Sequence, residues 1–380
     1  MCSILVKPAN TVDLRQNNRN RIFRFIYEAE APVSKQDVAR ALSLSLPTVS
    51  CNLTEMMQEG LLAYDGTKAS TGGRKPRSIS VVSNARFAAG ISLTDNNARI
   101  IAIDLGLSEL AFEEVDCTFE DSESYYSDIA AHFEQFLDRH ALAREKLLGV
   151  GVTIPGVVQP ETDFVEFAPT LNKKNVTLSG IKDALPYPAI LINDASASGF
   201  AEWRHHGKRS NMAYLSIERG VGGAILTNGS NYSGDHFRSG EFGHMCIVPG
   251  GTQCRCGCYG CLEAYCSTSV ISDRLGMTLE EFFSRLDAGS ERLSGIWSDY
   301  VLHLAQGISS IHAALDCDII LGGQLAFFIN KKLFLQIQEI LSRMDPFGSN
   351  GSYLRLGRFA SKSACIGAAM HYISNFVDNF

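Results

Sequence analysis

The sequence predicts an α/β protein that begins with a winged helix-turn-helix module and continues as two α/β lobes around a cleft. Three observations support this fold class. Two short helical patterns are joined by a tight turn near the start, a basic loop separates two strand patterns, and strands alternate with helices from residue 87 onward. The length of 380 residues suits two to three domains of roughly 100–200 residues each.

Composition excludes several classes of protein. Hydrophobic residues make up 45% of the chain and charged residues 20%, which is typical of globular domains rather than of a disordered chain. No apolar run reaches the roughly 18–20 residues of a membrane span, and residues 1–21 lack the apolar core of a signal peptide. We therefore expect a cytoplasmic protein without a membrane partner.

Charge is distributed unevenly along the chain. The net charge is −7, but residues 1–82 carry +4 and the remaining residues carry −11. A basic segment on an acidic body is typical of a protein that presents one module to a polyanion such as DNA. A chance fluctuation is the alternative, and charge alone does not decide between the two.

The first 60 residues predict three helices. Apolar residues at positions 22–26 place the first helix over about 14–30. Ser34, followed three residues later by Asp37, resembles a capping box that begins a second helix. After a turn over 43–45, Pro47 lies in the first turn of a third helix that ends at Gly60. Two short helices joined by a tight turn predict a helix-turn-helix motif.

A predicted wing follows the third helix. Strand patterns over 61–64 and 78–82 flank a basic, glycine-rich loop over 71–77. The third helix would enter the major groove of DNA, with Val49, Leu53 and Met56 facing inward. The expected DNA contacts are Ser45, Thr48, Cys51 and Asn52 in the helix and Arg74, Lys75 and Arg77 in the wing. The alternative is a small helical protein-interaction domain with a glycine-rich linker.

The alternation of strand and helix patterns after residue 87 predicts two similar α/β halves. The expected strands cover 88–93, 98–103, 147–154, 189–192, 213–217, 223–226 and 318–323, and the main expected helices cover 126–140 and 195–206, with further helices up to about 316 and after 323. We expect a DNA-binding domain over 1–82, a first lobe over 83–194 completed by a C-terminal helix over about 362–380, and a second lobe over 195–361.

The cysteines point to a metal site rather than to disulfides. Six of the eleven cysteines lie between Cys246 and Cys266, whereas a secreted disulfide scaffold would spread them along a short chain. The predicted ligands of a closed structural zinc site over 244–261 are His244, Cys254, Cys256 and Cys261. Cys258 lies in the same loop and could replace a neighbour, and a chance cluster of reduced thiols is the alternative.

Polar residues at one strand end predict a ligand site. Asn193 and Asp194 follow a buried strand, where α/β proteins bind ligands, and an amide beside a carboxylate suits paired sugar hydroxyls. The alternative is an N-cap for the helix over 195–206. If one imidazole nitrogen of His244 binds zinc, the other can point at a ligand hydroxyl. The segment over 220–223 resembles a phosphate loop, although a glycine-rich turn alone is weak evidence.

Together these residues resemble the ROK family (repressor, ORF, kinase). The resemblance is most specific from Glu241-Phe242-Gly243-His244 through Cys261-Leu262-Glu263, and Ile154-Pro155-Gly156, Asn193-Asp194-Ala195 and Leu321-Gly322-Gly323 occur in family order. It implies an actin/hexokinase-like (ribonuclease H-like) pair of lobes that close over a sugar. The sugar ligands that it implies are Gly156, Asn193, Asp194, Glu241, His244 and Glu263, and Asp194 matches the catalytic base of the family's sugar kinases.

The first lobe departs from the kinase pattern of that family. Where the kinases have an Asp-x-Gly-Gly-Thr phosphate loop, this sequence has Ser92-Leu93-Thr94-Asp95-Asn96. Without the glycines the backbone cannot approach a phosphate closely, and Asp95 would repel one. This departure and the N-terminal module indicate the repressor branch, similar to the xylose and N-acetylglucosamine repressors, and not an enzyme.

We therefore expect a sugar-responsive transcriptional repressor of carbohydrate metabolism. Its expected partners are operator DNA and a sugar effector, its expected cofactor is structural Zn²⁺, and it is expected to form a homodimer or homotetramer because operator half-sites lie about one helical turn apart. The alternative is an active ATP-dependent sugar kinase with an appended DNA-binding domain. A third possibility is regulation by a protein partner.

Overall fold

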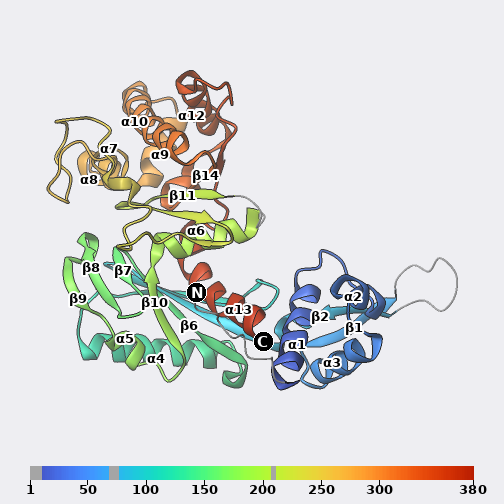
Figure 1. Cartoon of the computed structure of the whole chain (residues 1–380). Coiled ribbons are helices and arrows are strands. Elements are labelled where there is room, and N and C mark those ends of the chain that lie inside the picture. Colours follow the sequence, from blue (N-terminus) through green and yellow to red (C-terminus); the bar gives the residue numbers. More distant parts are fainter. Residues whose placement is uncertain (1–10, 68–76, 207–210) are drawn as a thin grey trace, which may run out of the picture.

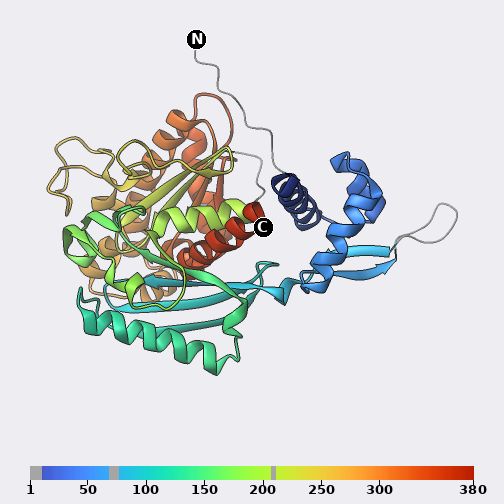
Figure 2. The same cartoon turned by 60° about the horizontal axis from the view of Figure 1, so that its bottom comes forward.

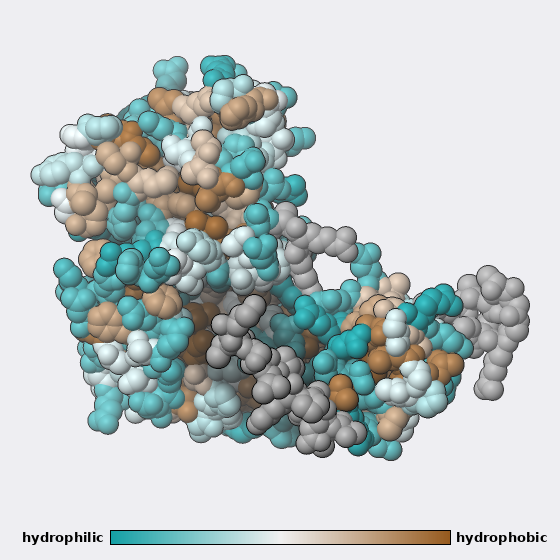
Figure 3. Space-filling view, viewed as in Figure 1, coloured by the Kyte–Doolittle hydropathy of each residue, from teal (hydrophilic) through white to brown (hydrophobic). Residues whose placement is uncertain are grey.

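The computed structural model describes residues 11–67, 77–206 and 211–380. A small N-terminal module lies beside a body made of two stacked α/β lobes (Figure 1). The module projects sideways from the first lobe, with open space between it and the second lobe (Figure 3). No helix within these described ranges is both long and apolar enough to cross a membrane.

Three helices and a two-stranded antiparallel sheet form the N-terminal module. Its elements are α1 (Thr11–Tyr27), α2 (Lys35–Leu42), α3 (Leu46–Gln58), β1 (Leu62–Thr67) and β2 (Arg77–Val81). Ser34 and Asp37 form the predicted capping box of α2, and the Ser45 side chain caps α3 by accepting a hydrogen bond from Thr48 N. Between these helices Ser43 takes the left-handed conformation, which turns the chain tightly.

A five-stranded sheet in the order β10-β6-β3-β4-β5 forms the first lobe. Its elements are β3 (Phe87–Leu93), β4 (Asn97–Asp104), β5 (Glu109–Asp116), α4 (Glu123–Arg139), β6 (Leu147–Ile154) and β10 (Ala189–Asn193). A second sheet of β7 (Val157–Gln159), β8 (Phe164–Ala168) and β9 (Lys173–Thr177) follows β6, and α5 covers Gly180–Asp183. The sequence did not predict β5 or this second sheet, because edge and short strands carry little buried apolar periodicity.

The second lobe repeats the arrangement, with a sheet in the order β13-β12-β11-β14-β15. Its strands are β11 (Met212–Ile217), β12 (Val221–Thr227), β13 (Ser230–Asn231), β14 (Asp318–Gly322) and β15 (Leu354–Leu356). Its helices are α6 (Asp194–His206), α7 (Glu263–Cys266), α8 (Thr268–Leu275), α9 (Leu279–Asp287), α10 (Glu291–Leu315), α11 (Gln324–Phe328) and α12 (Lys331–Met344). A large apolar core fills the space between this sheet and the helices α7 to α12.

The last helix, α13 (Ser363–Asn379), packs against β3, β4 and β6 of the first sheet and against α6 (Figure 2). Two glycines permit the contact with the sheet. A Cβ atom on Gly90 would lie 1.9 Å from the carbonyl oxygen of Cys365, and one on Gly151 would lie 2.4 Å from that of Ala368. Because any side chain would clash there, the backbone of α13 lies directly on the first sheet.

Candidate functional site

One histidine and three cysteines converge at the edge of the second lobe. His244 ends a short 3-10 turn, η4 (Phe242–His244), and the cysteines follow in the loop before α7. The loop is folded back on itself, since Cys254 N donates to Cys258 O at 2.8 Å and Gly260 N donates to Thr252 O at 2.8 Å. Gly260 has a φ of +80°, and an added Cβ would lie 1.9 Å from Val248 O, so only glycine fits this turn.

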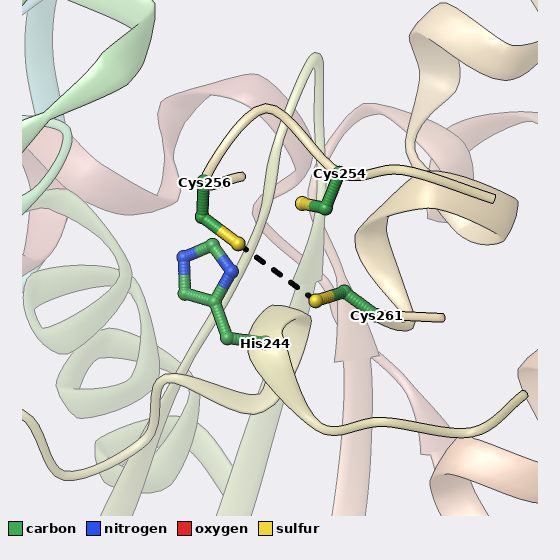
Figure 4. Close-up of side chains that lie close together, drawn as sticks. All are labelled: His244, Cys254, Cys256 and Cys261. Carbon is green, nitrogen blue, oxygen red and sulfur yellow. Dashed lines mark hydrogen bonds between the residues drawn. The ribbon is translucent and has the colours of Figure 1, made fainter. Parts of the chain in front are cut away.

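The geometry of this cluster fits a four-coordinate metal. One ligand atom from each of His244, Cys254, Cys256 and Cys261 lies within 4.8 Å of all the others. The Sγ atoms of Cys256 and Cys261 are 3.8 Å apart, and a tetrahedron with metal–sulfur bonds of roughly 2.3 Å has an edge of about 3.8 Å. Figure 4 shows one ring nitrogen of His244 directed toward the sulfur atoms.

The two nitrogens of His244 have different surroundings. Nδ1 is buried and has no hydrogen-bond partner among the described residues, as expected for an atom reserved for a metal ligand bond. Nε2 lies 3.7 Å from Oε2 of Glu241. The imidazole is therefore placed to join a metal on one side to the carboxylate of Glu241 on the other.

Asn193 and Asp194 lie where β10 ends and α6 begins. Asn193 Nδ2 donates to Gly156 O at 2.8 Å, and Asn193 Oδ1 accepts from Ser196 N at 2.7 Å. Asp194 Oδ1 accepts from Ala195 N at 2.7 Å. The amide of Asn193 thus also provides the helix cap that was the alternative interpretation of this pair, and it connects Gly156 to the start of α6.

Glu263 connects the cluster of one histidine and three cysteines to the start of β12. Its Oε2 accepts a hydrogen bond from Val221 N at 2.9 Å, and its Oε1 lies 3.6 Å from Cys254 Sγ. The glycine-rich segment over 220–223 therefore ends a hairpin turn and begins β12, and it does not open a helix. The Val221 amide, which a phosphate would need as a donor, is already used by a carboxylate.

Glu218 is a fourth carboxylate at this site, and the sequence analysis missed it. It follows β11 directly, and its Oε1 accepts from Gln324 N at the start of α11 at 3.0 Å. Its position after a buried strand, like that of Asn193 and Asp194, is the signal that could have identified it. The acidic groups Asp194, Glu218, Glu241 and Glu263 form what we call the interlobe carboxylates.

Burial raises the pKa of three of the interlobe carboxylates, Asp194, Glu218 and Glu241. It raises the pKa of Asp194 to about 6 and the pKa values of Glu218 and Glu241 to about 7. The negative charge of Asp194 adds to the shifts of both glutamates. Near neutral pH these groups can therefore both donate and accept hydrogen bonds, which suits the hydroxyl groups of a sugar.

Glu218→Gln is expected to stabilise the protein at pH 8 and to have a smaller effect at pH 5. With its folded pKa raised from 4.5 to about 7, Glu218 contributes most stability below pH 4.5, and this contribution is lost as pH rises through 7. Glutamine keeps the acceptor for Gln324 N without the buried charge, which removes a cost on the order of 1–3 kcal/mol. Urea unfolding at both pH values measures this difference.

A matched control for that experiment is Glu280→Gln, which changes an exposed glutamate on α9. The control should have similar small effects at both pH values. A Glu218→Gln protein that is less stable than the wild type at pH 8 would show that the charged form of Glu218 is favoured in the fold.

Two ion pairs join the lobes beside the interlobe carboxylates. Asp95, in the loop after β3, faces Arg219 of the second lobe with a separation of 3.8 Å. Glu166 on β8 pairs with Arg238 of the second lobe, with Arg238 Nε 3.2 Å from Oε2. The segment over 92–96 therefore faces the opposite lobe with an acid that attracts an arginine.

Three of the four DNA contacts predicted for the third helix lie at α3 with accessible side chains. Ser45 and Cys51 are exposed, and Thr48 is half-buried beside the Ser45 hydroxyl at 2.8 Å. Arg77 is exposed at the start of β2, with its guanidinium carbon 4.0 Å from the ring centre of Tyr64. Arg74 and Lys75 lie outside the described residues.

The prediction that Asn52 faces outward is wrong. Asn52 is only 4% exposed, and its Nδ2 donates to Thr48 O at 2.9 Å. It follows Val49 by three residues and precedes Met56 by four, so helical geometry places it on the inward face with them. Asn52 could reach a base only if α3 rotated about its own axis. The predicted contacts that remain for this helix are Ser45, Thr48 and Cys51.

Comparison with known proteins identifies the body. The model of the ROK family matches residues 88–371. The chain is 27% identical over 270 residues to the DNA-binding transcriptional dual regulator NagC of Escherichia coli K12, a match that covers 70% of this chain and 66% of NagC, just under two thirds of that curated relative. It is 25% identical over 357 residues to the xylose repressor of Caldicellulosiruptor bescii, covering 87% and 88% of the two chains.

Solved structures show the same fold. A ROK family transcriptional regulator, described as a homolog of the E. coli MLC protein, superposes with a TM-score of 0.79 at 22% identity and covers 96% of this chain and 97% of its own. A ROK hexokinase from Thermus thermophilus superposes with a TM-score of 0.63 at 22% identity, covering 77% of this chain and 99% of its own. The fold of the body is thus shared with hexokinases and that of nearly the whole chain with a regulator.

Proposed function

This chain belongs to the ROK family, and from that premise we propose that it is a sugar-responsive transcriptional repressor of carbohydrate metabolism. The observation that carries the proposal is the coexistence of two sites in one chain. A helical module with an exposed helix α3 is attached to a body whose interlobe carboxylates suit sugar hydroxyls. The regulator structure matches 96% of the chain, whereas the hexokinase matches 77%.

We propose that the N-terminal module is a winged helix-turn-helix domain. The support is geometric, since α2 and α3 are joined by a tight turn and followed by the antiparallel pair β1 and β2. In such domains the helix after the turn enters the major groove and the wing contacts the backbone. Ser45, Thr48 and Cys51 then face the DNA, and Arg77 lies at the base of the wing.

DNA binding by this module is expected to weaken steeply with salt. A protein that contacts 6–10 phosphates loses roughly 10³–10⁵-fold in DNA affinity when the salt concentration rises from 50 to 200 mM. Arg77→Gln should weaken binding to all sequences and reduce the salt slope by about 1. Fluorescence anisotropy with a duplex selected from a random-sequence pool measures both effects.

The control for this measurement is Arg292→Gln, which removes an exposed arginine from α10 of the second lobe. It should bind DNA like the wild type. Affinity that does not respond to salt would contradict phosphate-driven binding and favour the protein-interaction alternative for the module.

We propose that a sugar binds at Gly156, Asn193, Asp194, Glu241, His244 and Glu263, with Glu218 beside them. The cluster of His244, Cys254, Cys256 and Cys261 would hold a structural Zn²⁺, which supplies cross-linking of the loop rather than reaction chemistry. His244 then orients its Nε2 toward the sugar site, and Glu263 is held between Cys254 and Val221. The loop and the sugar site are positioned together.

The same geometry argues against phosphoryl transfer. Asp194 matches the position of the family's catalytic base, but Asp95 lies in the segment that replaces the kinase phosphate loop, and Glu263 occupies the Val221 amide. A base without a positioned donor gives little transfer, because phosphoryl transfer depends on positioning and charge neutralisation. The kinase alternative rests on Asp194 and on the shared fold.

We propose three functional units with the bounds 1–82, 83–194 together with 362–380, and 195–361. A homodimer or homotetramer would present two N-terminal modules to operator half-sites about one helical turn apart. A sugar that binds one arrangement of the lobes more tightly than the other would change the spacing of these modules. The size of that differential affinity limits the size of the response.

A further inference from the structure

We propose that helix α13 transmits the state of the sugar site to the DNA-binding module, with Phe380, Phe376 and Asp378 as the positioning residues of its last turn. This inference rests on the proposed function, because it assumes that sugar and DNA bind at the two sites described above. Its evidence is a continuous series of contacts from Asp194 to α3 through three helices.

The first contact joins the sugar site to α13. Asp194 is the first residue of α6, and one turn later the backbone of α6 touches α13. A Cβ atom on Gly367 would lie 1.8 Å from the carbonyl oxygen of Ala197, so the two helices meet backbone to backbone. Ser363 Oγ also donates to Ser198 Oγ at 3.1 Å. Because no side chain cushions this contact, a displacement of α6 has to displace α13.

The second contact is the position of α13 between the lobes. One side of α13 lies on β3 and β6 of the first sheet, at Gly90 and Gly151, and the other side lies on α6. The helix therefore touches elements of both lobes at once. A change in the angle between the lobes that follows sugar binding would alter how α13 is held.

The third contact joins α13 to the module. The Phe380 ring centre lies 4.7 Å from that of Phe23 on α1, and the Phe376 ring centre lies 5.7 Å from it. The guanidinium carbon of Arg19 lies 4.4 Å from the ring centre of Phe380. Arg24 Nη1 pairs with Asp378 at 3.3 Å. The contacting phenylalanines and the arginine over Phe380 hold the end of α13 against α1, and the exposed pair of Arg24 and Asp378 adds less.

The fourth contact continues from α1 to the DNA-facing helix. Arg15 pairs with Glu55 of α3, and Arg19 pairs with Glu59 just after it. Arg19 thus touches both α13, through Phe380, and the end of α3. Displacing α1 moves the helix that would enter the major groove.

A pocket of about 400 Å³ opens to solvent at the same junction. It is lined by both parts, including Tyr27 and Ile79 of the module and Leu105, Leu107 and Arg204 of the body. Beside this pocket, buried apolar side chains of the module, the first sheet and α13 form one continuous core, which includes Phe23, Ile79, Ile101 and Met370. Because this core is packed, the module is expected to follow a displacement of α13.

The experiment uses the full chain, a DNA duplex that the wild type selects from a random-sequence pool, and whichever of glucose, N-acetylglucosamine, xylose or fructose shifts its melting temperature. In the wild type the sugar should change DNA affinity by roughly 5–150-fold. Phe380→Ala should leave sugar affinity within about twofold and reduce the change in DNA affinity to less than about threefold. Asp378→Asn, which is isosteric, should reduce it partially.

The matched control is Phe347→Ala, which removes a phenylalanine that is 87% exposed in the loop after α12. It should keep the wild-type response. If Phe380→Ala does not fold, Asp378→Asn decides, together with hydrogen exchange of the α1 amides, which should respond to sugar in the wild type and less in the variant. Wild-type coupling in both junction variants would overturn the proposal. A wild type that binds no DNA or no sugar would instead contradict the proposed function, before any variant is compared.

Discussion

Cys256→Ser is expected to release zinc and to unfold the loop between His244 and Glu263. Thiolates hold zinc in closed sites, and zinc binding contributes folding free energy, about 10–16 kcal/mol in isolated zinc-finger peptides at neutral pH. In this larger lobe we expect the free energy of unfolding to fall by only several kcal/mol, because the apolar core of the second lobe remains packed. Metal analysis by mass spectrometry and thermal unfolding measure the two effects.

The same substitution should weaken sugar binding. His244 and Glu263 are held by the loop, the first as a ligand and the second through Cys254. The loss of a residue that orients a site in this way typically lowers affinity 10–100-fold, which is about 1.4–2.8 kcal/mol of binding free energy. Calorimetry with the sugar that binds the wild type would test this.

Cys258→Ser is the matched control. Cys258 lies in the same loop, is exposed, and is not among the four residues whose ligand atoms converge. It should keep one zinc per chain and its melting temperature. Zinc retained at full stoichiometry by Cys256→Ser, or a wild type prepared without zinc, would remove the basis for this metal site.

Asp194→Ala is expected to abolish sugar binding and leave DNA binding in the absence of sugar unchanged. A hydrogen bond to a charged group contributes about 1.5–3 kcal/mol, and the sugar hydroxyls would be left unpaired as well. We therefore expect sugar affinity to fall by roughly 100-fold or more. Asp194 also helps to start α6, so circular dichroism should confirm that the helix content is kept.

Asp128→Ala, which removes an exposed aspartate of α4, is the control and should bind sugar normally. In parallel, wild-type protein with sugar and Mg-ATP should release no ADP above background. Turnover that depends on Asp194 would mean that the segment containing Asp95 tolerates a phosphate donor, and the kinase alternative would replace the repressor. Sugar binding unchanged in Asp194→Ala would move the sugar site elsewhere.

Local patterns predicted the elements whose causes lie within a few residues. The capping box of Ser34 and Asp37 and the tight turn over 43–45 depend on neighbours in the chain, and the structure has both. The convergence of His244 with Cys254, Cys256 and Cys261 is similar, because closing a loop of fewer than about twenty residues costs little entropy. Strands buried on both faces were also evident, since continuous apolar runs are the strongest signal.

Side-chain direction was less predictable than element type. Asn52 is polar and was expected outside, yet helical geometry places it with Val49 and Met56. Glu218 follows a buried strand, but its burial depends on α11, which begins more than a hundred residues later, so the sequence alone does not predict it as a site residue. Strand β5 and the sheet of β7 to β9 were missed because edge strands are half exposed and mixed in composition.

By itself the sequence determined the family resemblance, the two lobes, the cluster of one histidine and three cysteines and the division into a basic module and an acidic body. Only the tertiary structure decided which acids share one site, that Asp95 faces Arg219, and that the last turn of α13 rests on α1. The physical reason is the distance along the chain over which each interaction acts. Capping, turns and loop closure are set by neighbours in the chain, whereas burial and charge pairing depend on which distant segments the packed core brings together.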